Sequence, residues 1–289
     1  MSNKLHFFRQ SSGGGGDAFI ATFRTTSANE TITLPYVSNG TYSGTIDFGD
    51  GTVVANTYAN RTHTYTVDGF YTVTILGDCV GWNFGLVADS VSKIYDIVNW
   101  GIGFQLISSN NGYFKDCVNL DITATDVLDT SNVTLMGGMF FGCNSLIFND
   151  SINSWDVSNV TRLDGAFLAC YEFNQPLNNW DTSSVIGFAS MFYLEREFNQ
   201  DVSSWDFSSI SRSNGLFNFI SSNFSSMNSS YYDNLLIKWA SDPSLGGLQP
   251  NIIDSISMGT IKYTANGASA RASILANNKA QVINDGGQI

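Results

Sequence analysis

The sequence predicts a mainly β protein with short helices: an antiparallel β-sandwich, then a solenoid of repeats, then a C-terminal α/β cap. Three patterns predict this order. Residues 69–75 alternate between polar and apolar side chains, as a half-buried strand does. Beyond them, tryptophan and phenylalanine recur at a step of 25 residues. Near residue 229 this period stops, and the apolar residues take the spacing of one helix face.

Length and composition limit the classes of protein to which this chain can belong. Its 289 residues suffice for two domains, or for one domain and a repeat array. Lys and Arg number 13 against 25 Asp and Glu, and the net charge of −12 disfavours nucleic-acid binding, since no basic face could neutralise a row of phosphates. Only 13% of the residues are charged, so Ser, Thr, Asn and Gly must form much of the surface. No apolar run reaches the length of a membrane span, so none is expected.

Residues 1–17 are expected to form a flexible arm that anchors the protein to a larger assembly. Phe7, Phe8 and Arg9 are the candidate anchor, because two aromatic rings beside a cation could fill pockets on an acidic partner. Gly13–Gly16 has the composition of a linker, and no Gly-Lys-Ser/Thr follows it, so it is not a phosphate-binding loop. The alternative is a disordered leader. The first residues lack the apolar core of a secretory signal, so secretion is not expected unless the signal is missing.

Residues 18–80 are expected to form the β-sandwich. Strands are predicted at Phe19–Phe23 and Glu30–Leu34, besides the alternating run already described. Asp50-Gly51 is a hairpin signal, because both residues tolerate the backbone angles of a tight turn.

Residues 81–228 are expected to form the solenoid. A period of 25 residues lies in the range of leucine-rich repeats, about 20–29 residues, and one such repeat cannot bury its apolar face alone. Equivalent aromatic residues should therefore stack as a continuous core. The predicted core aromatics are Trp155, Trp180 and Trp205, then Phe140, Phe167, Phe192 and Phe217, then Phe148, Phe173 and Phe198.

Three further rows of residues follow the repeats. Cys117, Cys143 and Cys170 are 26 and 27 residues apart, which is unlike the short spacing of zinc ligands, and are expected to form a buried ladder of small apolar groups. Each Asp-x-Ser after a tryptophan is expected to close a turn. Asn149, Asn174 and Asn199 are expected to form a buried ladder that bonds the backbone of neighbouring repeats; the alternative is a surface row of Asn and Asp that binds a ligand.

Residues 229–289 are expected to cap the open end of the repeats. Helices are predicted at residues 230–240 and 268–277, and short strands at residues 261–263 and 281–283.

The repeat resembles that of the BspA-like leucine-rich-repeat surface proteins. The residues that carry this resemblance are Trp155-Asp-Val-Ser-Asn-Val160, Met191-Phe192 and Phe173-Asn-Gln-Pro-Leu177. The preceding segment resembles a PKD-like (polycystic-kidney-disease) β-sandwich, on Phe48-Gly-Asp-Gly-Thr52, His63-Thr-Tyr65 and Gly69-Phe-Tyr-Thr-Val73. The two resemblances imply a PKD-like sandwich, a leucine-rich-repeat solenoid and a surface adhesion function without a fixed ligand.

No set of residues predicts catalysis, a cofactor or a metal. The only histidines are His6 and His63, and no Gly-x-Ser-x-Gly motif accompanies them. His63 is expected to pack or to bond a turn within the sandwich. Asp47 and Asp50 are read as turn-capping residues; weak Ca²⁺ binding is the alternative, although the glutamate of an EF-hand is absent.

The sequence therefore predicts a non-enzymatic recognition or adhesion protein. The first hypothesis is a phage virion component, such as a capsid or tail decoration, fibre or receptor-binding protein, that exposes its repeats to a host protein or glycan. The second is a bacterial cell-surface adhesin, and the third is a glycan-binding accessory module. The expected partners are virion or surface-assembly proteins bound by the arm, a host-surface protein or glycan, and a second copy of the chain in a homo-oligomer.

Overall fold

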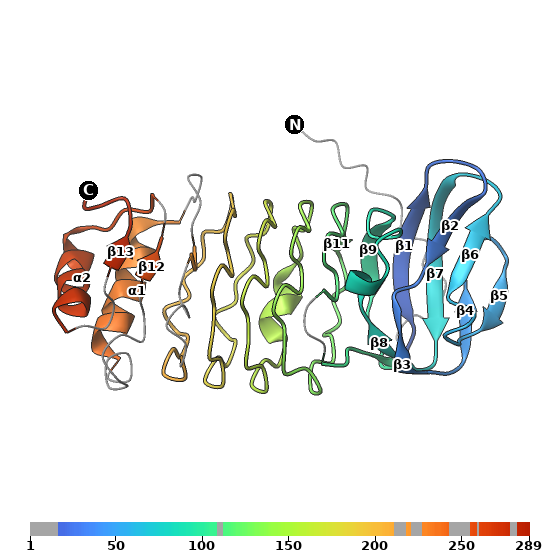
Figure 1. Cartoon of the computed structure of the whole chain (residues 1–289), viewed down its shortest axis with the longest axis horizontal. Coiled ribbons are helices and arrows are strands. Elements are labelled where there is room, and N and C mark those ends of the chain that lie inside the picture. Colours follow the sequence, from blue (N-terminus) through green and yellow to red (C-terminus); the bar gives the residue numbers. More distant parts are fainter. Residues whose placement is uncertain are drawn as a thin grey trace.

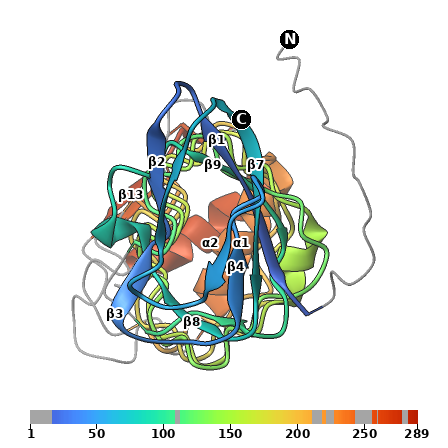
Figure 2. The same cartoon turned by 90° about the vertical axis from the view of Figure 1, so that its right-hand side faces the viewer.

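The computed structural model describes residues 17–108, 112–210, 218–220, 227–242, 255–258, 260–277 and 282–289. Figure 1 shows an elongated molecule with strands at one end and two α-helices at the other. The repeats lie side by side between these ends, and the view along the long axis in Figure 2 shows them superimposed.

Most strands lie in the first part of the chain. They are β1 (Phe19–Thr25), β2 (Glu30–Thr33), β3 (Tyr36–Tyr42), β4 (Thr45–Asp47), β5 (Val53–Ala55), β6 (Thr62–Tyr65), β7 (Gly69–Leu76), β8 (Cys79–Trp82), β9 (Ile94–Asn99), β10 (Phe104–Gln105) and β11 (Asp121–Ile122). Six of them form one sheet in the order β11-β9-β1-β7-β4-β5. A second sheet has the order β10-β8-β3, and β2 pairs with β6.

The large sheet runs across residue 80, the predicted end of the sandwich. Strand β1 is antiparallel to β7, with Phe19 opposite Ile75, and on its other side it is antiparallel to β9. The sequence pattern places the residues of β9 in the repeats. Strand β9 buries Ile94 and Ile97, three residues apart, because its register with β1 shifts twice. The alternation of apolar and polar residues that marks a regular strand is therefore absent from β9, and the sequence pattern could not reveal this strand.

The predicted fold class is wrong. The structure is mainly β with two α-helices, its sheets form an open, sandwich-like arrangement, and it does not show a leucine-rich-repeat solenoid. Such a solenoid contributes a strand from every repeat. The described residues between 123 and 228 contain no strand, only isolated bridges such as that of Leu135 with Arg162, and the short 3₁₀ helix η2 (Asp150–Ser154).

Turns, rather than strands, shape each repeat unit, and they explain the missing sheet. At the repeated phenylalanines from Phe114 to Phe192, the positions two residues before and two residues after the ring have positive φ, between 56° and 104°. Around Phe167 these are Gly165 and Ala169, with φ of 63° and 60°. A left-handed residue ends an extended run, so a continuous strand cannot form there.

Neighbouring units are held together by backbone hydrogen bonds and stacked rings. The amide of Phe140 donates to Ala166 O at 2.8 Å, and that of Phe167 donates to Met191 O at 3.0 Å. The ring centroids of Phe140 and Phe167 are 5.6 Å apart, and those of Phe167 and Phe192 are 5.7 Å apart. Each unit thus buries its phenylalanine against the same residue of the next unit, which supplies the core of this region.

The C-terminal end contains α1 (Ser229–Ser241), α2 (Ala265–Ala276) and the parallel pair β12 (Ser255–Ser257) and β13 (Val282–Asn284). Both predicted helices are present. Helix α1 begins after Asn228, whose side chain accepts the amide of Ser230, and its Trp239 lies against Phe207. The strand predicted at 261–263 is wrong, because Tyr263 makes only an isolated bridge with Gln288.

Candidate functional site

Within the described residues, every predicted aromatic core residue is buried, at 0–5% exposure. Trp180 and Trp205 stack with ring centroids 6.2 Å apart and an interplanar angle of 6°. Their indole N–H groups donate to Ile152 O and Leu177 O, each at 2.8 Å, so the rings also bond the backbone of the preceding unit. These side chains stabilise the repeats and are closed to a ligand.

Phe217 lies outside the described residues, and the hydrogen bonds give its expected place to another residue. The amide of Phe192 donates to Phe219 O at 2.9 Å, as that of Phe167 donates to Met191 O. Asn218, with φ of 51°, has the left-handed backbone found two residues before each repeated phenylalanine. The residue equivalent to Phe192 is therefore Ile220.

The three cysteines of the repeats are buried free thiols in neighbouring units. The thiol of Cys143 donates to Phe114 O, and that of Cys170 donates to Phe140 O, both at 2.9 Å. Burial raises the pKa of all three thiols, so the nucleophilic thiolate is disfavoured.

Glu195 occupies the cysteine position in the next unit. It is 1% exposed, and its Oε1 accepts the amide of Cys170 at 2.7 Å. Burial raises the pKa of Glu195, the bond from Cys170 lowers it in part, and the charge of Glu172 raises it again. The net increase holds this carboxyl toward its neutral form.

The predicted anchor residues Phe7, Phe8 and Arg9 lie outside the described residues. His63 is described: its Nε2 lies 2.7 Å from Asp50 Oδ2, and its ring stacks on Phe48 at 4.4 Å. Asp50 also accepts the amide of Thr52, and Asp47 accepts that of Gly49. These groups therefore close turns, and the described part of the chain holds no cluster of three His, Cys, Asp or Glu side chains suited to a metal.

The Asp-x-Ser motifs form turns at the surface. Asp156 Oδ1 accepts the backbone N–H and the hydroxyl of Ser158 at 3.0 and 2.6 Å, and the same bonds lower its pKa. The Asn row bonds neighbouring units, as in Asn174 Oδ1, which accepts the amide of Asn199 at 2.9 Å, but Asn174 is exposed. The oxygens that the sequence offered for a ligand are thus largely engaged within the protein.

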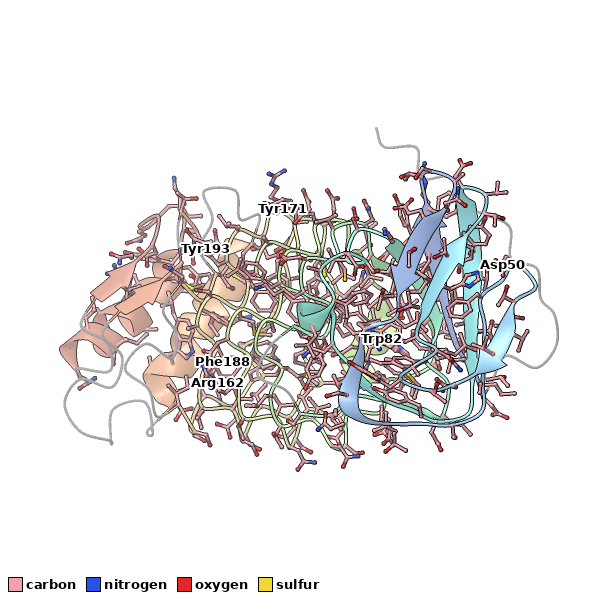
Figure 3. All side chains as sticks on the ribbon, turned by 45° about the vertical axis from the view of Figure 1, so that its right-hand side comes forward. Asp50, Trp82, Arg162, Tyr171, Phe188 and Tyr193 are labelled. Atoms are coloured by element: carbon pink, nitrogen blue, oxygen red, sulfur yellow. The ribbon has the colours of Figure 1, made fainter. Side chains whose placement is uncertain are left out.

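Five other residues form the candidate recognition site, which we call the aromatic edge: Lys115, Phe141, Tyr171, Tyr193 and Arg196. They occupy the first and fourth positions after the repeated phenylalanines, one unit after another. Backbone bonds keep these positions in register: the amide of Gly142 donates to Leu168 O and that of Ala169 to Tyr193 O. In Figure 3, Tyr171 and Tyr193 lie along the upper edge of the repeats.

Cations lie over two rings of the aromatic edge. Lys115 Nζ is 5.1 Å from the ring centroid of Phe141, and Arg196 Cζ is 4.2 Å from that of Tyr171. A cleft of about 200 Å³ lies beside Phe141, lined also by Lys115 and Asp164. The edge therefore offers half-buried rings and two cations on a chain that is otherwise strongly acidic.

Apolar and acidic residues complete the surroundings of the aromatic edge. Leu194, between Tyr193 and Glu195, is 41% exposed. Glu172 and Glu197 follow Tyr171 and Arg196 and are also exposed. Of these side chains, the aromatic rings and the arginine are of the types enriched at protein–protein interfaces.

Sequence reasoning missed the aromatic edge because it looked for residues that repeat. Position one after the phenylalanine holds Lys115, Phe141, Leu168 and Tyr193 in successive units, so no period marks it. A sequence signal for the aromatic edge was nevertheless present: at a fixed position of a regular repeat, the side chain is large but differs from unit to unit.

Residues 108–231 match the profile of a family described as "Mycoplasma protein of unknown function, DUF285". This stretch contains the repeats and the start of α1, and it is less than half of the chain. The family is associated with BspA-like surface repeat proteins, and the match confirms neither a leucine-rich repeat nor a PKD domain. Neither a curated protein nor a solved structure matches the chain. Among the described helices, none combines the length and the apolar character that crossing a membrane requires.

Proposed function

We propose that this protein is a non-enzymatic recognition protein that binds a partner protein on a host surface through the aromatic edge. The observation that carries the proposal is the pairing of Lys115 with Phe141 and of Arg196 with Tyr171 across neighbouring units. Aromatic residues and arginine are the side chains that contribute most to protein–protein binding.

Rigidity supports this assignment. The backbone of the edge is fixed by unit-to-unit hydrogen bonds, and the buried phenylalanines stack directly beneath it. A partner would therefore meet rings that are already in place, and little entropy would be lost on binding. The family match supports the surface setting, since that family is associated with surface repeat proteins.

Binding to whole cells tests the proposal. Fluorescently labelled full-length protein is incubated with a panel of bacterial cells, including the strain that encodes it. We expect Tyr171→Ser with Arg196→Ser to reduce saturable binding at least tenfold. The matched control is Tyr58→Ser with Arg61→Ser, which removes an equivalent pair, 3.8 Å apart, from the loop between β5 and β6. Equal binding by the two double variants would overturn the assignment of the aromatic edge.

The setting of the protein is a separate part of the proposal. We propose a virion component, anchored through residues 1–17, with a bacterial cell-surface adhesin as the alternative. Mass spectrometry of purified particles and of washed cell envelopes distinguishes the two. Deleting residues 1–17 should leave the melting temperature nearly unchanged and remove the chain from particles. A chain found only in envelopes would contradict the virion setting and leave the recognition test unaffected.

A further inference from the structure

A polar groove of about 330 Å³ lies between the last regular repeats and helix α1. Its lining residues are Asn178, Gln200, Asp201, Ser203, Ser204 and Tyr231. It lies at sequence positions different from those of the aromatic edge, and it is independent of the function proposed for that edge. The lining of the groove thus combines amide, hydroxyl and carboxylate groups with one aromatic ring.

The groove exists because a row of amide side chains ends there. Asn153, Asn178 and Ser203 hold the same position in three successive units. Asn153 Nδ2 donates to Asn178 Oδ1 at 3.2 Å, but the short side chain of Ser203 cannot continue the row. Helix α1 then begins at Ser229 and supplies Tyr231 to the lining.

Neighbouring groups hold the lining side chains in place. Gln200 Nε2 donates to the backbone and side-chain oxygens of Asn174 at 3.0 and 2.9 Å. Asp201 Oδ1 accepts the amide of Ser203 at 2.9 Å, and its Oδ2 accepts from Asn234 Nδ2 at 2.8 Å. A ligand would therefore meet donors and acceptors that are already oriented.

Part of the hydrogen-bonding capacity of these groups remains available to a ligand. Within the described residues, Gln200 Oε1, the Ser203 hydroxyl and the Tyr231 hydroxyl have no hydrogen-bond partner shown. Each carboxylate oxygen of Asp201 accepts one bond here and has room for a second. Acceptors, hydroxyls and a ring within one small groove match a ligand that carries several hydroxyl groups on a compact apolar frame.

Charge and volume narrow the class of ligand. The lining has no cation, so phosphate, sulfate and anionic sugars are disfavoured. Its single carboxylate gives too little charge for a calcium cage, and its polar lining is unsuited to an apolar molecule. The volume is at the small end of ligand sites, about 300–1,000 Å³. We infer that the groove binds a neutral sugar residue of a glycan, with hydroxyl groups bonded to Asp201 and Gln200 and one sugar face against Tyr231.

The experiment screens the labelled full-length protein on an array of neutral and anionic oligosaccharides. The best neutral oligosaccharide is then titrated by calorimetry, with and without EDTA. We expect Ser203→Asn to weaken binding at least tenfold, because the added amide continues the row and fills the groove. Tyr231→Ala and Asp201→Asn should weaken it by a similar factor. The control is Asp181→Asn, since Asp181 bonds Ser183 as Asp201 bonds Ser203 but lies outside the groove.

The outcomes separate this proposal from the one for the aromatic edge. Neutral-glycan binding that Ser203→Asn removes, and that the change of Tyr171 and Arg196 leaves intact, supports the groove whatever the cell-binding test shows. Thermal melts exclude unfolding as the reason for a loss. Absence of neutral-glycan binding, binding that survives Ser203→Asn in the folded variant, or binding abolished by EDTA would each overturn the inference.

Discussion

Arg196 lies over the ring of Tyr171, with the guanidinium carbon 4.2 Å from the ring centroid. The two residues are 25 positions apart, so they occupy the same place in adjacent repeat units. Their contact shows that side chains which do not repeat can still be placed against one another by the parts of the unit that do. The structure accordingly predicts different results for repeated and non-repeated positions.

Truncating a repeated tryptophan should be costly. Trp180 is 4% exposed, stacks on Trp205 and donates to Ile152 O. Trp180→Ala should lower the free energy of unfolding by about 3–5 kcal/mol, because the fixed neighbouring units cannot close the cavity. Urea denaturation measures this loss. Ser184→Ala, at an exposed position of the same unit, is the control, and superimposable curves for the two variants would refute the packing role of Trp180.

Glu195 should make the stability of the protein depend on pH. Burial raises its pKa above the value of about 4.3 for an unfolded chain, so between the two pKa values only the folded state keeps the proton. Stability therefore falls as the pH rises through this window. Glu195→Gln should stabilise the protein at pH 8, and its advantage should shrink toward pH 4. Thermal melts across this range measure the effect, and an advantage that grows on acidification would contradict it.

The left-handed positions should tolerate glycine and asparagine better than alanine. At Gly165, φ is 63° and an added Cβ would meet nothing nearer than 3.8 Å, so strain is the main cost. Gly165→Ala should lower the free energy of unfolding by about 1–2 kcal/mol. Gly165→Asn should cost less, although asparagine is larger, since it adopts this conformation more readily. Chemical denaturation measures both variants. A larger loss of stability for Gly165→Asn than for Gly165→Ala would show that the size of the side chain, and not the backbone conformation, determines the cost.

The four thiols should be unreactive in the native protein. Cys79, Cys117, Cys143 and Cys170 are fully buried, and burial raises the pKa of each thiol. Ellman's reagent should modify none of them in native buffer and all four in urea. Rapid modification of one thiol without denaturant would show that its unit opens locally.

Packing within the repeats could be predicted from the sequence, while the path of the backbone could not. The buried residues Trp155, Trp180 and Trp205 recur at one step, and a fixed step implies stacking. The same step is compatible with strands or with turns. Whether the backbone forms strands or turns depends on left-handed residues such as Ala169 and Leu194. Alanine and leucine are not residue types that predict a left-handed conformation.

The candidate sites were harder to predict, because both depend on residues that do not repeat from unit to unit. The replacement of asparagine by Ser203 becomes visible only when three units are aligned. The groove that results also needs Tyr231, which comes from a helix outside the repeats. Ile220 takes the place expected for Phe217 because the unit before it is longer. A single sequence gives no measure of such a shift.

At the repeated phenylalanines the hydrogen bonds between units point the same way: the amides of Phe114, Phe140, Phe167 and Phe192 each donate to a carbonyl of the following unit. The steps between these phenylalanines are 26, 27 and 25 residues, so the alignment tolerates small differences in the length of a unit. Duplication of one complete unit would also preserve it, and the chain can therefore lengthen in evolution by whole modules. Each added module would place the polar groove about 5 Å farther from the β-sheet end. The number of repeat units therefore sets the distance between the two ends of the protein.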